Sequence, residues 1–466
     1  MNQFIQFVLS KLQGGIFLLL LAVSLFAGCL LLAYGICKRK GKTFQWKKVI
    51  LWTLLSCYLL VLFYVTLLRG ISVAFRSWNL HLFRAWREAW NEFSATSWLN
   101  VLLNVAMFAP LGALLPLFST KLKKWHTTVG IGFALSLAIE LLQLWWGNGV
   151  CDVDDLFTNT LGTLIGYAAV MLVVTIGQRS RTGKKTIFCY VAALLLPIVA
   201  ICAIFLVYHL KPYGNIPYMA SFRADTSNTN WTLACALPQV ENSAKTYRAK
   251  TMSKEACASL ADEFMQTFGI VFDDIQYYDE DAFFMDHGGD DGSHFLIVNY
   301  WDGSYHYTVN GTEEETWKDT DREAILSALS QYPLTIPENA IFSAVGDGWH
   351  SFRADRLVID QYMYDGTVLC RYGSGGEIYE IENHLIPYMP FSEQKIISPE
   401  EAYHRLCIGD FSNGEYFEMK NPANIQVTGA RLEYRIDTKG FYRPVYVFDL
   451  VSTDTKYRMP VAVRAD

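Results

Sequence analysis

Six apolar stretches, each long enough to cross a lipid bilayer, fill most of the first 208 residues of this 466-residue chain. A helix needs about 20 apolar residues to cover a hydrocarbon core about 30 Å thick. Within that core a helix satisfies its own backbone hydrogen bonds, so a polytopic α-helical membrane bundle over residues 1–208 is predicted. The six predicted transmembrane helices are Ile16 to Ile36, Val49 to Leu68, Trp98 to Phe118, Trp125 to Trp146, Phe157 to Ile176 and Ile187 to Tyr208.

The loops between these spans predict how the chain is oriented in the cell membrane. Residues 38–48, 121–124 and 179–185 carry Lys and Arg and no acidic residue, which is typical of cytoplasmic loops. The loop 147–156 has no Lys or Arg and three Asp residues, so it is expected outside. The loop 69–97 has charges of both signs and is placed outside by parity. With six spans, both termini and residues 209–466 are expected to be extracytoplasmic.

The charge balance reverses where the apolar stretches end. Residues 1–208 contain 18 basic and 6 acidic residues, and residues 209–466 contain 21 basic and 39 acidic residues. The second part is therefore predicted to be a water-soluble, extracytoplasmic domain. Its negative charge argues against a nucleic-acid partner and against docking onto anionic lipid.

The pattern of residues 209–466 is typical of an α+β domain. Residues 295–300 and 305–309 are strand-like and flank Asp302-Gly303, which predicts a hairpin. Further strands are expected at 432–436 and 444–450. The sequence leaves open whether the domain is one unit or two related α+β units. Helices are expected to begin at Ser253, at Thr320 with Glu323, and at Ser398 with Glu401, where capping patterns occur.

Cysteine and histidine give little sign of chemistry. Four cysteines in the exterior domain, an even number, would allow one or two disulfides in an oxidising compartment, with a pairing that the sequence does not give: Cys235, Cys257, Cys370 and Cys407. No C-x-x-C, G-x-S-x-G, H-E-x-x-H, Walker or dinucleotide motif occurs, so no cofactor and no metal are predicted. The scattered histidines of this domain are interpreted as surface residues rather than ligands: His287, His294, His306, His350, His384 and His404.

Polar side chains within and beside the spans gather in the outer half of the predicted bundle. Glu140 lies about 20 Å into the fourth span, at about 1.5 Å per residue. Gln143 shares its helical face, and Asn100 and Asn104 share a face of the third span. The candidate ligand-binding residues are Arg69, Asn100, Asn104, Glu140, Gln143, Asp152, Asp154, Asp155 and Asn159.

Each of these residues has a structural interpretation beside the functional one. A charged side chain in the bilayer centre costs at least about 2.5 kcal/mol, which makes Glu140 a functional-site candidate unless it is protonated or paired with Arg69. The amides serve ligand binding or bond across helices. The Asp-rich loop 152–155 caps the fifth predicted helix or contacts a metal or ligand. Gly162 and Gly166 are expected to permit close helix packing.

The order of these motifs resembles the VanZ-like family of membrane proteins, over about residues 51–174. The matching motifs are Asn100-x3-Asn104-x3-Phe108-Ala109-Pro110-Leu111-Gly112, Glu140-x2-Gln143, Asp152-Val153-Asp154-Asp155, Asn159-Thr160-Leu161-Gly162 and Gly166-Tyr167. The resemblance implies a link to low-level teicoplanin resistance in Gram-positive bacteria, and it brings no established enzymatic mechanism. Many relatives carry an Arg shortly before the Asp motif, whereas residues 147–151 contain none.

Two functions follow as hypotheses. In the first, the bundle presents a polar outer-leaflet pocket to an envelope ligand, either a lipid-linked cell-wall precursor or a lipoglycopeptide. There Arg69 would meet a phosphate or carboxylate, Glu140 an ammonium, and the exterior domain would modulate access or bind a partner. In the alternative, the protein is a membrane-embedded enzyme acting on a lipid head group. Glu140 would then be its general base, with Asp154 or Asp155 holding a divalent metal.

Overall fold

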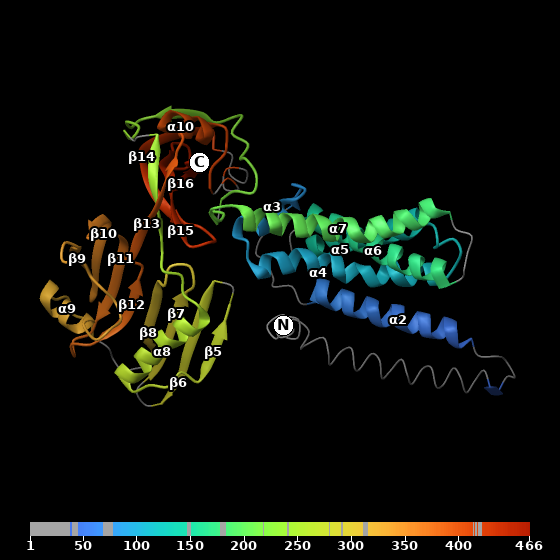
Figure 1. The fold of residues 1–466 in the computed structure, drawn as a ribbon, viewed down its shortest axis with the longest axis horizontal. Coiled ribbons are helices and arrows are strands. Elements are labelled where there is room, and N and C mark those ends of the chain that lie inside the picture. Colours follow the sequence, from blue (N-terminus) through green and yellow to red (C-terminus); the bar gives the residue numbers. More distant parts are fainter. Residues whose placement is uncertain are drawn as a thin grey trace. The chain divides into compact units, whose positions relative to one another are not determined.

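In the computed structural model the chain folds into two compact units (Figure 1). The first unit is Met1–Trp86 with Ser97–Leu210, and the second is Arg87–Thr96 with Lys211–Asp466. The structure describes residues 38–39, 45–68, 78–146, 151–177, 183–217, 219–239, 242–278, 280–289, 292–310, 316–412, 414, 417 and 422–466.

Within this described part, the first unit has five helices long and apolar enough to cross a membrane. They match the second to sixth predicted spans, and the first, Ile16 to Ile36, lies outside the described residues. A π-helical turn, Tyr64–Leu68, continues α2, and a 3₁₀ turn, Leu115–Leu117, follows α4. The five helices are α2 (Trp46–Phe63), α4 (Ala95–Leu114), α5 (Trp125–Trp146), α6 (Val153–Gly177) and α7 (Lys184–Leu210).

The outward faces of these helices are apolar. On α7, the side chains of Leu196, Val199 and Leu206 are each more than half exposed in the isolated molecule. On α2 the same holds for Trp52 and Leu60. So much exposed apolar surface is unfavourable in water and is what a hydrocarbon solvent accommodates, so we assign these helices to the bilayer.

Glycines allow the backbones of α6 and α4 to come into direct contact. A Cβ added to Gly162 would overlap the carbonyl oxygen of Val105 on α4, and one added to Gly166 would overlap that of Ala109. Gly112 of α4 faces the backbone of Thr163 in the same way. The predicted small-residue packing face is confirmed, because only glycine leaves room for this approach.

The second unit is built on a large sheet. Among the described residues fourteen strands form one hydrogen-bonded sheet, in which β13 pairs with β11 at its start and with β4 beyond it. The strands are β3 (Asn230–Leu233), β4 (Ser243–Arg248), β5 (Asp274–Tyr277), β6 (Asp281–Gly289), β7 (Gly292–Asn299), β8 (Tyr305–Asn310), β9 (Ile341–Gly346), β10 (Trp349–Ile359), β11 (Tyr362–Tyr372), β12 (Ile378–Asn383), β13 (Ile386–Lys395), β14 (Asn424–Ile436), β15 (Phe441–Ser452) and β16 (Arg458–Arg464).

Three helices pack on this sheet and form its two main cores. Phe264 of α8 (Lys254–Phe268) and Ile325 of α9 (Arg322–Leu329) are buried in one core, against strands β6 to β12. Leu406 of α10 (Pro399–Cys407) is buried in the other, against β14 to β16. The predicted α+β class and the strands at 295–300, 305–309, 432–436 and 444–450 are therefore confirmed.

The helix starts were predicted correctly in two of three cases. Ser253 accepts the N–H of Ala256 at the start of α8, and Ser398 accepts the N–H of Glu401 at the start of α10. The expected start at Thr320 is wrong by one residue, since the cap of α9 is Asp321. A carboxylate at this position accepts the free N–H and also favours the positive end of the helix dipole.

The four cysteines of the second unit, which would have allowed one or two disulfides, form none. Cys235, Cys257, Cys370 and Cys407 are all free thiols. Cys257 and Cys370 are fully buried in the core around α8, where they pack as small apolar residues. Burial raises the pKa of Cys257 to about 11 and that of Cys370 to about 12, so both stay protonated and unreactive at neutral pH.

Residues 87–96 are part of the second unit through α3 (Arg84–Glu92). The buried Asn91 donates to the carbonyl of Met219 at 3.1 Å and accepts from Arg464 at 3.3 Å. Arg87 donates to the carbonyl of Ser221 at 3.0 Å. Arg87 and Asn91 of this short helix thus form hydrogen bonds with residues that follow α7 in the chain.

Replacing Gly166 with Leu should destabilise the membrane bundle. The new side chain would collide with the Ala109 backbone, which cannot rotate away, and overpacking costs typically about 1–3 kcal/mol. We expect a lower melting temperature of the purified protein in detergent. Gly130→Leu on α5 is the matched control, because a Cβ there meets nothing within 4 Å. Equal melting temperatures for the two variants would contradict the packing described above.

Candidate functional site

The candidate site lies in the first unit, where a short strand pair meets the start of α6. β1 (Trp78–Asn79) runs parallel to β2 (Cys151–Asp152), with Asn79 opposite Asp152. α6 begins at the next residue, Val153. The pair thus fixes a segment that precedes α4 against the first turn of α6.

Asp152 is the centre of this arrangement. Its Oδ1 accepts from the side-chain amide of Asn79 at 2.9 Å and from the N–H of Asp154 at 2.8 Å. Its own N–H donates to Oε2 of Glu140 at 2.9 Å. Glu140 is only 2 % exposed. The carboxylates of Glu140 and Asp152 are therefore linked through one backbone amide, across α5 and β2.

Asp154 holds the segment that leads into α3. Its two oxygens accept the backbone N–H groups of Phe83 and Ala85, and its side chain is buried, 1 % exposed. Phe83 has a φ of 69°, a left-handed conformation that a bulky side chain rarely adopts. Asp154 stabilises this turn and places a negative charge at the first turn of α3.

Two further pairs connect α6 with its neighbours. Asn104 of α4 donates its side-chain amide to Asp155, and Asn159 donates to the hydroxyl of Ser136 on α5 at 2.9 Å. Ser136 is fully buried and Asn159 is 4 % exposed. Within the part of the chain that the structure describes, the Oδ1 of Asn159 has no hydrogen-bond partner. A buried acceptor left without a donor is costly, so a donor placed at this atom would stabilise the bundle.

The remaining predicted residues lie elsewhere. Gln143 donates to the carbonyl of Thr66 at 2.8 Å, in the π-helical turn that ends α2. Such turns disrupt the regular α-helical ladder, and here a side chain from α5 satisfies one of its carbonyls. Asn100 is exposed on α4. Arg69 lies outside the described residues.

The structure thus gives six predicted residues hydrogen-bond partners at the start of α6 and on the helices beside it, in three separate sets. We call these six residues the polar cluster: Asn104, Glu140, Asp152, Asp154, Asp155 and Asn159. The sequence analysis missed Asn79 and the backbone of Phe83 and Ala85. Asn79 was detectable as an amide in a loop predicted to lie outside, whereas backbone donors leave no signal in a sequence. The capping interpretation of the Asp-rich loop is confirmed, because Asp152 accepts the N–H of Asp154 at the start of α6.

Asp154→Ala should loosen the segment around Phe83. Two N–H groups would lose their acceptor, and each unsatisfied buried donor costs about 1–3 kcal/mol. Since 1.4 kcal/mol is a factor of about 10 in an equilibrium constant, amide exchange in residues 81–86 should accelerate at least about 10-fold in hydrogen–deuterium exchange.

Asp155→Ala is the matched control for this experiment. It removes the neighbouring carboxylate on the same helix and the bond to Asn104, but it leaves the acceptor of Phe83 and Ala85 in place. Equal exchange of residues 81–86 in the two variants would show that Asp154 does not hold the segment.

Comparison with known proteins places this region in a family. The family model described as VanZ/LLP1 matches residues 55–174, which include the whole polar cluster. No curated protein matches the chain. Among solved structures, the chain is similar to the Bacillus megaterium YpeB C-terminal domain, with 14 % identity over 47 % of this chain and 95 % of that one and a TM-score of 0.16. Residues 55–174 of this protein are a VanZ-like domain of a membrane protein.

Proposed function

We propose that the VanZ-like domain binds a ligand of the cell envelope at its polar cluster. The observation that carries this proposal is the set of acids buried there with no cationic partner among the described residues. Among the residues that the structure describes, none of Glu140, Asp152, Asp154 and Asp155 forms an ion pair with Lys or Arg. Ionisable groups at membrane depth are costly and are retained where they serve function.

The cluster is rich in hydrogen-bond acceptors, and this sets the chemistry of the ligand. Glu140 uses one carboxylate oxygen for the Asp152 amide, Asp155 uses one for Asn104, and Oδ1 of Asn159 has no described partner. The remaining acceptors suit a ligand with ammonium, amide or hydroxyl donors. A lipid-linked cell-wall precursor or a lipoglycopeptide carries such donors beside an apolar tail that fits a bilayer site.

The proposal also includes two predicted residues outside the polar cluster, Arg69 and Asn100. Arg69 follows directly on the π-helical turn Tyr64–Leu68, and Asn100 lies one helical turn before Asn104. The guanidinium would meet a phosphate or carboxylate of the ligand. The predicted topology places these residues toward the outside, where an envelope ligand arrives. A link to glycopeptide tolerance is part of the proposal through the family alone.

The hydrogen bonds of the polar cluster do not support the enzymatic alternative. It needs Asp154 or Asp155 as a metal ligand beside Glu140, but both oxygens of Asp154 accept backbone N–H groups and one oxygen of Asp155 accepts from Asn104. These carboxylates act as acceptors that hold the fold together. Ligand binding, in contrast, needs only those oxygens of the polar cluster that accept no hydrogen bond within the protein.

Glu140→Gln tests the proposal. The amide oxygen still accepts the Asp152 N–H, so the fold is retained, but the negative charge is lost. A hydrogen bond to a charged group is worth about 1.5–3 kcal/mol, so affinity for an amine-bearing ligand should fall about 10-fold to 100-fold. Mass spectrometry of lipids and envelope precursors that co-purify with each protein measures the loss.

Glu92→Gln is the control, since Glu92 lies outside the polar cluster. It should retain every species that co-purifies with the wild-type protein. The proposal fails if Glu140→Gln, at equal membrane abundance and equal melting temperature, retains the same species in the same amounts.

A further inference from the structure

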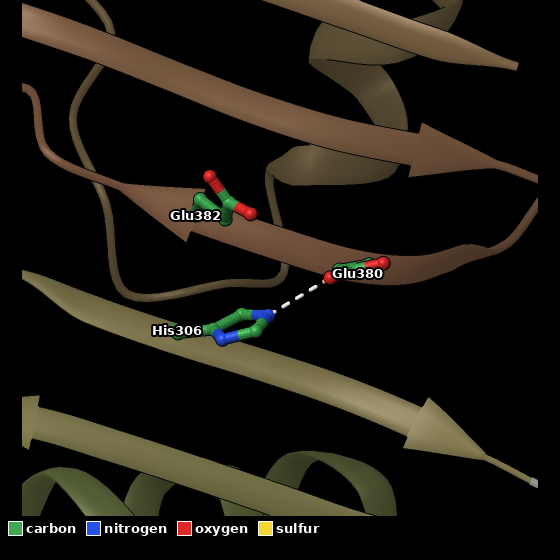
Figure 2. Close-up of side chains that lie close together, drawn as sticks. All are labelled: His306, Glu380 and Glu382. Atoms are coloured by element: carbon green, nitrogen blue, oxygen red, sulfur yellow. Dashed lines mark hydrogen bonds and ion pairs between the residues drawn. The ribbon is translucent and has the colours of Figure 1, made fainter. Parts of the chain in front are cut away.

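Three potential metal ligands meet on the sheet of the second unit, away from the VanZ-like domain (Figure 2). His306 lies on β8, and Glu380 and Glu382 lie on the adjacent antiparallel strand β12. His306 is directly opposite Glu382 in the register, and Glu380 is two residues away on the same face. We infer that these three side chains form a binding site for a divalent transition metal ion, with Zn²⁺ as the ion that fits them best.

The distances are close to those of a metal centre. One ligand atom from each residue lies within 4.8 Å of the other two, and Nε2 of His306 is 2.9 Å from Oε1 of Glu380. Tetrahedral Zn²⁺ with bonds of about 2.0–2.1 Å sets its ligand atoms about 3.3 Å apart. Small rotations of the two Glu side chains close the remaining gap, while the strands hold the backbone in place.

The site lies on the face of the sheet opposite the helices. Tyr305 and Tyr307, which flank His306 on β8, are buried and pack against Phe264 of α8. Successive side chains alternate between the faces of a strand, so His306 points away from that core. The side chains of His306 and Glu380 are 36 % and 25 % exposed, which leaves the ligand atoms within reach of an ion from solution.

The charges around the site favour a dication. In the described parts of the chain, neither Glu380 nor Glu382 forms an ion pair with Lys or Arg. Arg371 is the cross-strand neighbour of Glu380, but its guanidinium lies over the ring of Trp317, 3.8 Å from the centroid. An ion pair of protonated His306 with Glu380 would neutralise the charge of only one of the two glutamates. A metal ion with two positive charges would neutralise both glutamates.

The donor set selects the kind of metal. One imidazole nitrogen and two carboxylate oxygens are typical ligands of Zn²⁺ and its first-row neighbours, whereas Mg²⁺ and Ca²⁺ prefer oxygen alone. Three protein ligands leave a coordination position open for water or for an anionic group of a partner molecule. This site therefore has the composition of an open centre rather than that of a closed structural one.

The test is Zn²⁺ binding to the full-length protein in detergent, by isothermal titration calorimetry with metal content measured in parallel. His306→Gln should remove one Zn²⁺ per chain or weaken it at least about 100-fold, beyond the roughly 10-fold to 100-fold cost of losing a second-shell partner. Zn²⁺ should also raise the melting temperature of the wild-type protein and not that of the variant.

Two further variants make the result decisive. Glu382→Gln removes a ligand without touching the His306–Glu380 bond and should weaken Zn²⁺ to a similar extent, so it replaces His306→Gln if that variant does not fold. His384→Gln is the control, because His384 is exposed just beyond β12. Unchanged Zn²⁺ stoichiometry and affinity in His306→Gln or in Glu382→Gln would overturn the assignment, as would an equal loss in His384→Gln.

Discussion

Placing carboxyl groups at the end of an apolar helix bundle imposes a strict requirement for hydrogen-bond donors. Glu140 and Asp154 are almost completely buried, and each must recover what it loses by leaving water. The donors are local backbone N–H groups, at Asp152 for Glu140 and at Phe83 and Ala85 for Asp154. The loop before α3, the strand pair and the start of α6 all take their positions from these bonds.

The same requirement explains why the helices pack so closely. Asn104 reaches Asp155, and Asn159 reaches Ser136, only if α4 and α5 lie close to α6. Gly162 and Gly166 permit this approach by leaving room for backbone carbonyls of α4. In a bilayer no hydrophobic effect drives helices together, so small residues and interhelical polar bonds supply the attraction. The polar cluster and the glycine face are therefore two parts of one packing arrangement.

Local patterns in the sequence predicted much of this structure. Five apolar spans, the Asp302-Gly303 hairpin and two of three helix starts were correct, because each depends on residues close together in the chain. Features that depend on distant residues were missed or wrong. The pairing of Asn79 with Asp152 joins residues 73 apart. The number of cysteines allowed disulfides in the second unit, but a count gives no distance between thiols, and the described cysteines are free.

The trio of His306, Glu380 and Glu382 illustrates the same limit in the second unit. His306 and Glu380 are 74 residues apart, and only the pairing of β8 with β12 makes them neighbours. Two glutamates at alternate positions of a strand were visible in the sequence, but not the histidine opposite them. A site formed by residues on adjacent strands can therefore be recognised only from the pairing register of the sheet.

The parallel pairing of β1 with β2 has a consequence for biogenesis. β1 leaves the ribosome before α4 and α5, and β2 emerges only after them, so the two strands can pair only once both intervening helices have been synthesised. Until then the side-chain amide of Asn79 lacks its acceptor, Asp152. The backbone N–H groups of Phe83 and Ala85 likewise lack theirs, Asp154. This end of the bundle therefore cannot close before the start of α6 has been synthesised.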